Sequence, residues 1–182
     1  MSGTVQTAGI DRVGIGTDLH RLAGGRRLVL GHVQIEHDAG PVGHSDGDVV
    51  LHAVIDAAAG AAGLPDIGET FPDNDPAYKD ADSATLLEKV MRAVADRGYA
   101  IVNVDVTIHA EKPRLGPHKP AIRDEVARLL GLAAQAVSIK AKTNEGLDAV
   151  GRGEAIACTA VVGLSIIRPA RQPEAQARDI SR

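Results

Sequence analysis

The sequence predicts an α+β fold, in which a mixed β-sheet of about four to five strands carries three helices on one face. Three segments place apolar residues at helical spacing, and each ends at a glycine: Gly63, Gly98 or Gly131. Other segments are rich in Val, Ile and Leu, and residues 101–110 alternate apolar and polar side chains as a half-buried strand does. One layer of helices on one face of a sheet buries both kinds of apolar surface.

The elements follow one another in a mixed order. The expected strands are residues 12–17, 28–35 with a bulge or turn at Gly31, 101–110, 137–143 and 154–167. The expected helices are residues 46–62, capped by Ser45 or Asp46, a second from Asp82 or Ser83 to Gly98, and 120–130. Residues 36–43, 64–80 and 144–153 are expected to be loops, and the proline-rich, acidic loop 64–80 is of the kind that is usually functional or mobile.

The chain is long enough for one domain with its own core. We place that domain at residues 10–168, with a flexible N-terminus at 1–9 and a disordered tail at 169–182, because both ends are polar or charged. The single cysteine, Cys158, lies in an apolar segment and is expected to be a small buried residue.

The composition argues against several classes of protein. A formal net charge of −4 does not suit a nucleic-acid binder with a basic surface. Aromatic residues make up only 2% of the chain, so a nucleotide is not expected to be held by aromatic stacking. No apolar run approaches the roughly 20 residues of a membrane span, and no signal-peptide pattern opens the chain. These features predict a cytoplasmic protein.

Two short segments rich in histidine and aspartate point to a metal site. His44 and His52 lie at the start of the first expected helix, and Asp18 and His20 end the first expected strand. Asp-x-His in an extended segment directs both side chains to one face. A lone histidine near a helix start is more often a cap or a solvated side chain. Two imidazoles and one carboxylate, however, form a three-ligand site with one open position, as in catalytic zinc sites.

Four motifs occur in order along the chain. They are G-I-G-T-D-L-H at 14–20, G-H-S-D-G-D-V-V-L-H at 43–52, D-I-G-E-T-F-P-D-N-D at 66–75 and G-R-G-E-A-I-A at 151–157. Together they resemble the 2-C-methyl-D-erythritol 2,4-cyclodiphosphate synthase family of the non-mevalonate isoprenoid pathway, from about Arg12 to about Ile167. The resemblance implies a phosphorus–oxygen lyase that converts 4-diphosphocytidyl-2-C-methyl-D-erythritol 2-phosphate to 2-C-methyl-D-erythritol 2,4-cyclodiphosphate and releases CMP.

The resemblance also implies two metal ions. Asp18, His20 and His52 match the family's ligands for Zn²⁺ or another divalent transition metal. Glu145 matches the ligand of a second divalent ion, Mg²⁺ or Mn²⁺, that binds with the diphosphate. Asp48 is then expected to orient one of the imidazoles.

The resemblance also assigns catalytic and substrate-binding roles to other residues. His44 would steady the transition state and Thr143 would bond a phosphate. Residues 66–75 would contact the erythritol hydroxyls and phosphates, and residues 110–116 would wrap the cytidine, largely through the backbone. The substrate-binding residues implied in this way are Ser45, Asp66, Ile67, Gly68, Phe71, Pro72, Asp73, Asp75, Ala110, Arg114, Leu115, Gly116, Ala141, Lys142 and Arg152.

The chain departs from the family pattern at a few positions. Lys142 and Asn144 stand where threonines are usual. Arg152 and Glu154 match a pair at the mouth of a central cavity, where isoprenoid diphosphates have been proposed to bind. Thr17 and Ala149, however, replace bulky aromatics that usually line that cavity.

Family members are homotrimers, so the resemblance implies three sheets packed around a three-fold axis. Active sites would lie between subunits, with the residues from Asp18 to Asp75 of one subunit facing those from Ala110 to Glu145 of the next. The expected partners are a small-molecule cytidine diphosphate substrate and two further copies of the chain, with no nucleic acid and no membrane.

Two other functions stay open at this point. The protein could be a zinc-dependent phosphohydrolase, for which His44 is the one base near the metal site that could take a proton from water. It could also be a regulatory trimer that binds a metal or an isoprenoid without turnover. The complete set of Asp18, His20, His52 and Glu145 argues against the second alternative.

Overall fold

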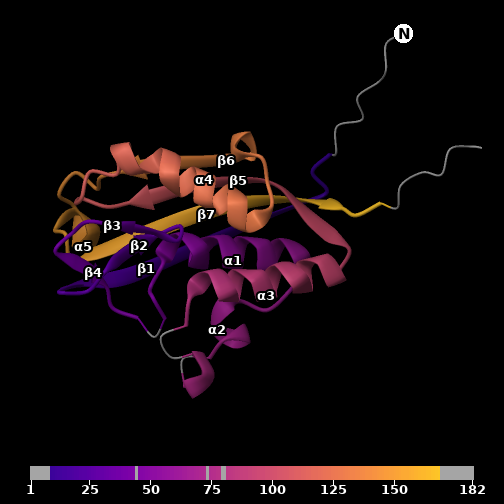
Figure 1. Cartoon of the computed structure of the whole chain (residues 1–182), viewed down its shortest axis with the longest axis horizontal. Helices are drawn as coiled ribbons and strands as arrows, with labels where there is room; N and C mark the ends of the chain where they lie inside the picture. Colours follow the sequence, from indigo (N-terminus) through magenta and orange to yellow (C-terminus); the bar gives the residue numbers. More distant parts are fainter. Residues whose placement is uncertain (1–8, 44, 73, 79–80, 169–182) are drawn as a thin grey trace, which may run out of the picture.

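A five-stranded mixed sheet lies at the centre of the computed structural model, which describes residues 9–43, 45–72, 74–78 and 81–168 (Figure 1). Its strands, in the order β4-β1-β7-β5-β6, are β4 (Ala39–Pro41), β1 (Arg12–Gly24), β7 (Ala155–Ile166), β5 (Tyr99–His109) and β6 (Val137–Lys142). Strand β6 runs parallel to β5, and the other neighbours are antiparallel. The predicted mixed sheet is thus confirmed.

Two details of the predicted strands were wrong. The first strand does not end at Thr17 but continues to Gly24, because residues 18–21 go on pairing with β7 and residues 22–24 pair with β4. Strand β4 lies in the segment that was expected to be a loop. The segment 28–35 is two strands, β2 (Leu28–Leu30) and β3 (Val33–Ile35), which form a hairpin around Gly31, so the turn interpretation is the right one.

Three long helices lie on one face of this sheet: α1 (Val49–Ala62), α3 (Ser83–Asp96) and α4 (Lys119–Leu130) (Figure 1). Helix α1 packs across β1 and β7, α4 packs on β6, and α3 packs on α1 and β5. Gly63 and Gly131 end their helices in the left-handed conformation, as predicted, and Asp82 caps α3.

The expected loops contain short helices that the sequence did not indicate. Helix α2 (Ile67–Thr70) and the 3₁₀ turn η1 (Pro76–Tyr78) interrupt residues 64–80, and α5 (Asp148–Gly151) interrupts residues 144–153. Two further 3₁₀ turns are η2 (Gly116–His118) and η3 (Ala134–Ala136). One-turn helices carry too few residues to show a periodic pattern.

Helix α1 lies unusually close to β1 because the facing strand positions are glycines. A Cβ at Gly14 would lie 1.9 Å from the Ala57 carbonyl oxygen, and one at Gly16 would lie 2.1 Å from that of Ala53. Twelve of the fourteen residues of α1 are buried, which makes it the central helix. The start of this helix is thereby held against the middle of β1, where Asp18 and His20 lie.

The cap of α1 differs from the prediction. Asp48, rather than Ser45 or Asp46, is the N-cap, and its carboxylate accepts hydrogen bonds from the backbone N–H groups of Val50 and Leu51. It also accepts from the N–H groups of Gly31 and His32 in the β2–β3 turn, at 2.9 and 2.6 Å. This carboxylate is fully buried, and burial raises its pKa to about 6. Asp48 therefore joins the hairpin to α1 instead of orienting an imidazole.

Among the described residues, no long helix covers the opposite face of the sheet, and only the short α5 lies near its edge. Val13, Ile15 and Leu19 of β1 point to this side and are 64%, 67% and 63% exposed, and Val161 of β7, which pairs with Ile15, is 37% exposed. The same strands turn Ile156, Cys158 and other buried residues toward the helices, which confirms the expectation for Cys158.

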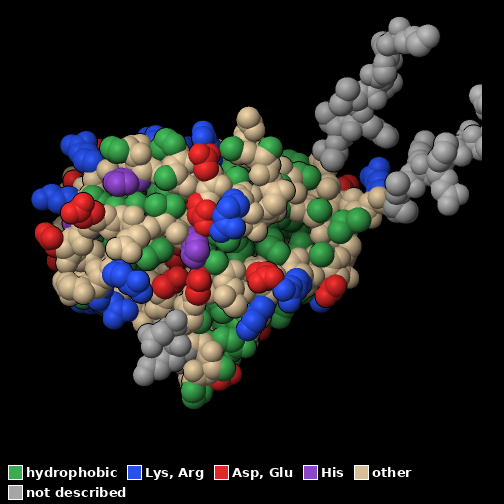
Figure 2. Space-filling view, viewed as in Figure 1, with side chains coloured by type: hydrophobic (Ala, Val, Ile, Leu, Met, Phe, Trp, Pro, Cys, Tyr) green, Lys and Arg blue, Asp and Glu red, His purple; other side chains and the backbone are tan. Residues whose placement is uncertain are grey.

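Acidic and basic side chains are intermixed on the face in view in Figure 2. Among the described residues, no helix has the length and hydropathy needed to cross a bilayer. Of the end segments 1–9 and 169–182, which were expected to be flexible or disordered, all residues except Gly9 lie outside the described residues.

Candidate active site

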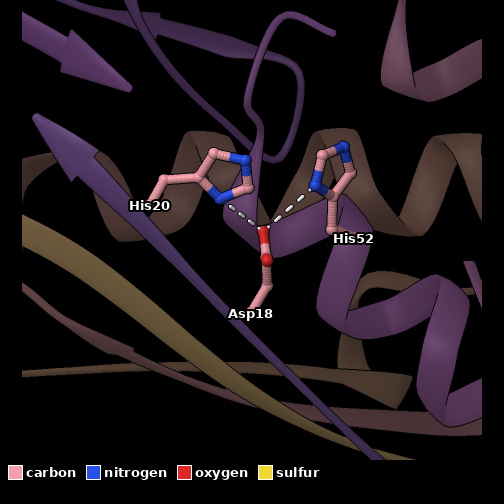
Figure 3. Close-up of side chains that lie close together, drawn as sticks. All are labelled: Asp18, His20 and His52. Atoms are coloured by element: carbon pink, nitrogen blue, oxygen red, sulfur yellow. Dashed lines mark hydrogen bonds and ion pairs between the residues drawn. The ribbon is translucent and has the colours of Figure 1, made fainter. Parts of the chain in front are cut away.

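Asp18, His20 and His52 come together where β1 passes the first turn of α1 (Figure 3). Asp18 and His20 alternate with outward-facing residues on β1, so both face the helix, and His52 projects toward them from α1. Nδ1 of His20 and Nδ1 of His52 lie 2.9 and 3.0 Å from the same oxygen, Oδ2 of Asp18. One ligand atom from each residue lies within 4.8 Å of the others. The predicted ligand set is therefore assembled within one chain.

The three side chains fit a divalent cation. Nδ1 of His20 is buried and makes no hydrogen bond among the described residues, although Asp18 is close. Burial raises the pKa of the Asp18 carboxyl, but the two neighbouring imidazoles outweigh this and lower the pKa to about 2. The site thus holds an ionised carboxylate and an imidazole nitrogen without a partner, and a metal ion would satisfy both.

Two serines hold the other side of the His52 ring. Nε2 of His52 lies 2.9 Å from the Ser83 hydroxyl and 3.2 Å from the Ser45 hydroxyl. Ser83 is fully buried, and its hydroxyl donates to Asp46. These contacts leave Nδ1 directed at Asp18, which is how groups behind a metal ligand usually fix its orientation. The sequence indicated Ser83 only as a possible helix cap and not as part of this site. The start of α3 becomes a neighbour of His52 only in the folded chain.

The triad opens into a cavity of about 380 Å³. Of the substrate-binding residues implied by the resemblance, Ser45, Ile67, Gly68 and Phe71 line this cavity with the triad. Tyr78, which the sequence did not indicate, lines it too, and its ring packs edge-on against Phe71 at 5.1 Å.

Of the three aspartates that the resemblance implies in residues 66–75, two do not line this cavity and accept hydrogen bonds from nearby backbone groups, and the third is not described. Asp66 caps α2 by accepting from the Glu69 N–H, and Asp75 accepts from the Ala77 N–H. Pro72, between them, is partly buried. His44 and Asp73 lie outside the described residues, so their expected roles depend on the sequence motifs.

A second cavity, of about 350 Å³, lies at the C-terminal ends of β5 and β6. Seven of the implied residues line it: Ala110, Arg114, Leu115, Gly116, Ala141, Lys142 and Thr143. Glu145 follows β6 and accepts a hydrogen bond of 2.8 Å from the Thr143 hydroxyl. The implied residues between Ala110 and Glu145 are therefore also brought together within one chain.

The loop that carries Glu145 is fixed by side chains. Asn144 Oδ1 lies 3.1 Å from His109 Nδ1, and Asn144 Nδ2 donates to Asp148 at 2.9 Å. Asp148 in turn accepts from the backbone N–H groups of Val150 and Gly151. Arg152 forms an exposed ion pair with Glu154 at 3.0 Å and lines neither of the two cavities.

The two cavities are separate within one chain. Asp18 pairs with Cys158, Cys158 with Ile108, and Ile108 with Ala141, so Asp18 and Ala141 lie in one row across four strands. Three strand spacings put their backbones roughly 14 Å apart, and none of the described residues lines both cavities. Each chain thus has two separate candidate regions. We name the triad with the first cavity the early half-site, and the second cavity with Thr143 and Glu145 the late half-site.

Comparisons with known proteins agree with these features. The model of the YgbB family matches residues 11–165. The 2-C-methyl-D-erythritol 2,4-cyclodiphosphate synthase of Bordetella avium is 55% identical over 154 residues, which cover 85% of this chain and 95% of the relative.

Solved structures are similar as well. A structure of 2C-methyl-D-erythritol-2,4-cyclodiphosphate synthase in a CDP-bound form is 38% identical, with a TM-score of 0.79 over 85% of this chain and 100% of that one. The bifunctional IspDF of Campylobacter jejuni is 39% identical, with a TM-score of 0.82, and this chain spans 42% of its length.

Proposed function

The chain belongs to the YgbB family of 2-C-methyl-D-erythritol 2,4-cyclodiphosphate synthases, and we propose that it performs their reaction with the two half-sites described above. It converts 4-diphosphocytidyl-2-C-methyl-D-erythritol 2-phosphate to the 2,4-cyclodiphosphate and CMP, and is thus a phosphorus–oxygen lyase of isoprenoid precursor synthesis. The observation that carries the assignment of the site is the convergence of Asp18, His20 and His52 beside a cavity.

In this reaction an oxygen of the 2-phosphate forms a bond to the β-phosphorus, and the bond from that phosphorus to the CMP oxygen breaks. Both reacting groups belong to one molecule, so the protein has to fold the substrate back on itself and to stabilise negative charge. No protein nucleophile is required.

The early half-site would hold the reacting phosphates. Asp18, His20 and His52 fit Zn²⁺ or a similar divalent ion, which as a Lewis acid would neutralise charge on a phosphate oxygen. Ser45, which lies beside His52, is proposed to donate to a phosphate. His44 is proposed as the residue that steadies the transition state, on the strength of the motif alone.

The late half-site would hold the nucleotide. Arg114 and Lys142 line its cavity and supply positive charge for the diphosphate. Thr143 is proposed to donate to a phosphate. Glu145, which follows it on an exposed loop, is proposed to bind Mg²⁺ or Mn²⁺ together with the diphosphate oxygens.

We further propose that a complete site forms between two subunits of a homotrimer. Three observations support this. The two half-sites lie about 14 Å apart in one chain. The apolar residues Val13, Ile15 and Leu19 are exposed on an uncovered sheet face, which is typical of an interaction surface. On that face the buried oxygens Asn103 Oδ1 and Asp105 Oδ1 have no hydrogen-bond partner among the described residues.

Phosphorus NMR of the protein with substrate tests the reaction. A cyclic diphosphate together with CMP is the expected result. Inorganic phosphate would indicate the phosphohydrolase instead, and binding without any new phosphorus signal would indicate a regulatory protein.

The metal site is tested by His52→Ala, with His37→Ala as the matched control, since the structure gives His37 no contact with the triad. We expect the first variant to keep its circular dichroism spectrum but to lose both bound metal and activity, because one of three ligands is gone. Stoichiometric zinc in a folded His52→Ala protein would contradict the ligand set.

Subunit sharing is tested by mixing two inactive variants, His52→Ala and Glu145→Ala. If subunits exchange at random, about a quarter of the sites join an intact early half to an intact late half, so activity should return to that level. Mixed trimers seen by mass spectrometry without any activity would contradict a shared site.

A further inference from the structure

The aromatic rings of Phe71 and Tyr78 form a wall between two cavities. Both residues line the first cavity, which holds the triad, and both also line a third cavity of about 450 Å³ between α1 and α3. No other described residue lines both of these cavities. A side chain that borders open space on two sides lacks part of the van der Waals contacts that normally fix its position.

The backbone around these rings has few bonds to the rest of the fold. Phe71 ends α2 and Tyr78 ends η1, which are one-turn elements with local backbone hydrogen bonds. Within residues 66–72 and 74–78, the one hydrogen bond to a long helix among the described residues runs from the Ile67 N–H to Asp56 of α1. Helix α2 projects from the side of the helix layer (Figure 1). The position of the wall therefore depends largely on side-chain contacts.

Lys89 of α3 supplies a contact to both rings. Its Nζ lies 5.2 Å from the centroid of the Tyr78 ring and 5.9 Å from that of the Phe71 ring, and the two rings pack edge-on at 5.1 Å. A cation within about 6 Å of a ring centroid is attracted by the ring electrons. Lys89 lines the third cavity and not the first, so it contacts the wall on the side away from the triad.

We propose that Lys89 is a positioning residue for the early half-site, because its ammonium holds the rings of Phe71 and Tyr78 where they form the wall of the first cavity. This inference rests on the proposed function, since it takes that cavity to bind the substrate. Lys89 acts through the rings and touches no reacting atom, so it contributes to substrate binding and not to the chemical step. A cation–π contact at an exposed site corresponds to a factor of about two to five in an equilibrium constant.

Steady-state kinetics of the metal-loaded enzyme test this role in four proteins. They are the wild type, Lys89→Met, Lys89→Arg and the control Arg92→Met, which removes an exposed cation one turn further along α3. We expect Lys89→Met, an uncharged side chain of similar length, to raise KM about two- to fivefold and to leave kcat nearly unchanged. Lys89→Arg should keep a KM near that of the wild type, because a guanidinium also stacks on aromatic rings.

The control separates the ring contact from a general effect of charge. Arg92→Met loses the same charge but no ring contact, so its KM should equal that of the wild type. An unchanged KM in Lys89→Met would overturn the inference. An equal rise of KM in Arg92→Met would overturn it too, because the effect would then come from net charge alone.

A double-mutant cycle with Tyr78→Leu shows whether the effect passes through the rings. In the Tyr78→Leu protein the ring nearer to the ammonium is absent. Adding Lys89→Met to it should therefore raise KM by a smaller factor than in the wild type. An equal factor in both backgrounds would contradict an action through the wall.

Amide hydrogen exchange without substrate tests the contact independently of the reaction. Residues 67–72 should exchange about two to five times faster in Lys89→Met, because they open more often, and at the wild-type rate in Arg92→Met. Faster exchange in a protein that forms no cyclic diphosphate would support the holding of the wall and overturn only the proposed reaction. If the protein forms the product but Lys89→Met changes neither exchange nor KM, only the role of Lys89 is overturned.

Discussion

The two faces of β1 differ in what covers them. On one face Gly14 and Gly16 leave no room for a side chain, and α1 packs directly on the strand. On the other face Val13, Ile15 and Leu19 are exposed and have nothing over them within the described chain. The covered face brings His52 to Asp18 and His20, so one chain assembles the whole candidate metal site. The open face has apolar side chains that no described residue buries, and the proposed trimer would cover them.

Gly16→Ala tests the covered face and should have the largest effect. The new Cβ would lie 2.1 Å from the Ala53 carbonyl oxygen, which is backbone and cannot rotate away. We expect a loss of about 3 kcal/mol or more in the free energy of unfolding, or a melting temperature lower by roughly 10 °C. Thr17→Ala, one residue along on the open face, is the control and should change little. A melting temperature equal to that of the wild type would show that β1 and α1 can separate without cost.

Ile15→Asp tests the open face. A charge in the middle of the exposed apolar patch should prevent the proposed trimer from forming, because a charge buried at an interface without a partner is strongly unfavourable. Analytical ultracentrifugation should show monomers that keep the wild-type circular dichroism spectrum and have lost most activity. Ile15→Val should remain trimeric. A trimeric and active Ile15→Asp protein would place the interface elsewhere.

Ser83→Ala tests whether the covered face also holds the His52 ring in position. The variant removes the hydroxyl that lies 2.9 Å from His52 Nε2 and that donates to Asp46. Groups behind a metal ligand usually contribute 10- to 100-fold to metal affinity or activity, and we expect an effect of about this size in a zinc competition titration with a chelator. Ser138→Ala, at an exposed position of β6, is the matched control. An unchanged zinc affinity would mean that Asp18 alone orients His52.

His32→Asn should give the smallest effect, and one that depends on pH. His32 occupies a left-handed position with φ 63° at the tip of the β2–β3 hairpin, a conformation that asparagine tolerates. Its imidazole lies 2.9 Å from Glu125 on α4 and 3.5 Å from Asp82 at the start of α3. The hydrogen bond to Glu125, together with the charge of Asp82, raises the pKa of His32.

Because the folded-state pKa of His32 is raised, the protonated ring stabilises the fold fully below its unfolded pKa of about 6.5. That contribution is lost as the pH rises through the folded-state value. The side chain is 36% exposed, so the effect should stay below about 1 kcal/mol. Urea unfolding of the wild type and His32→Asn at pH 6 should reveal the difference, and at pH 9 the two should coincide. A difference that is equal at both pH values would show that the loss comes from packing and not from charge.

The sequence predicted much of the framework for identifiable reasons. The helix that ends at Gly63, the strand 101–110 and the long last strand were found because apolar periodicity and glycine caps are local signals. Asp18 and His20 could be paired because two residues apart in a strand share a face, and His52 was added by the motif resemblance. The short elements α2, α5 and β4 were missed because a single turn or a three-residue strand leaves no periodic trace.

Only the tertiary structure decided the rest, because it depends on contacts between residues far apart in the chain. Asp48 was expected to face an imidazole, yet its carboxylate binds the turn at Gly31 and His32, seventeen and sixteen residues away. Ser83 and Tyr78 join the early half-site only when α3 and η1 fold over it. The roughly 14 Å between the half-sites follows from the strand order β1-β7-β5-β6. No local pattern encodes strand order, because order is set by which apolar faces pack together once the whole chain has folded.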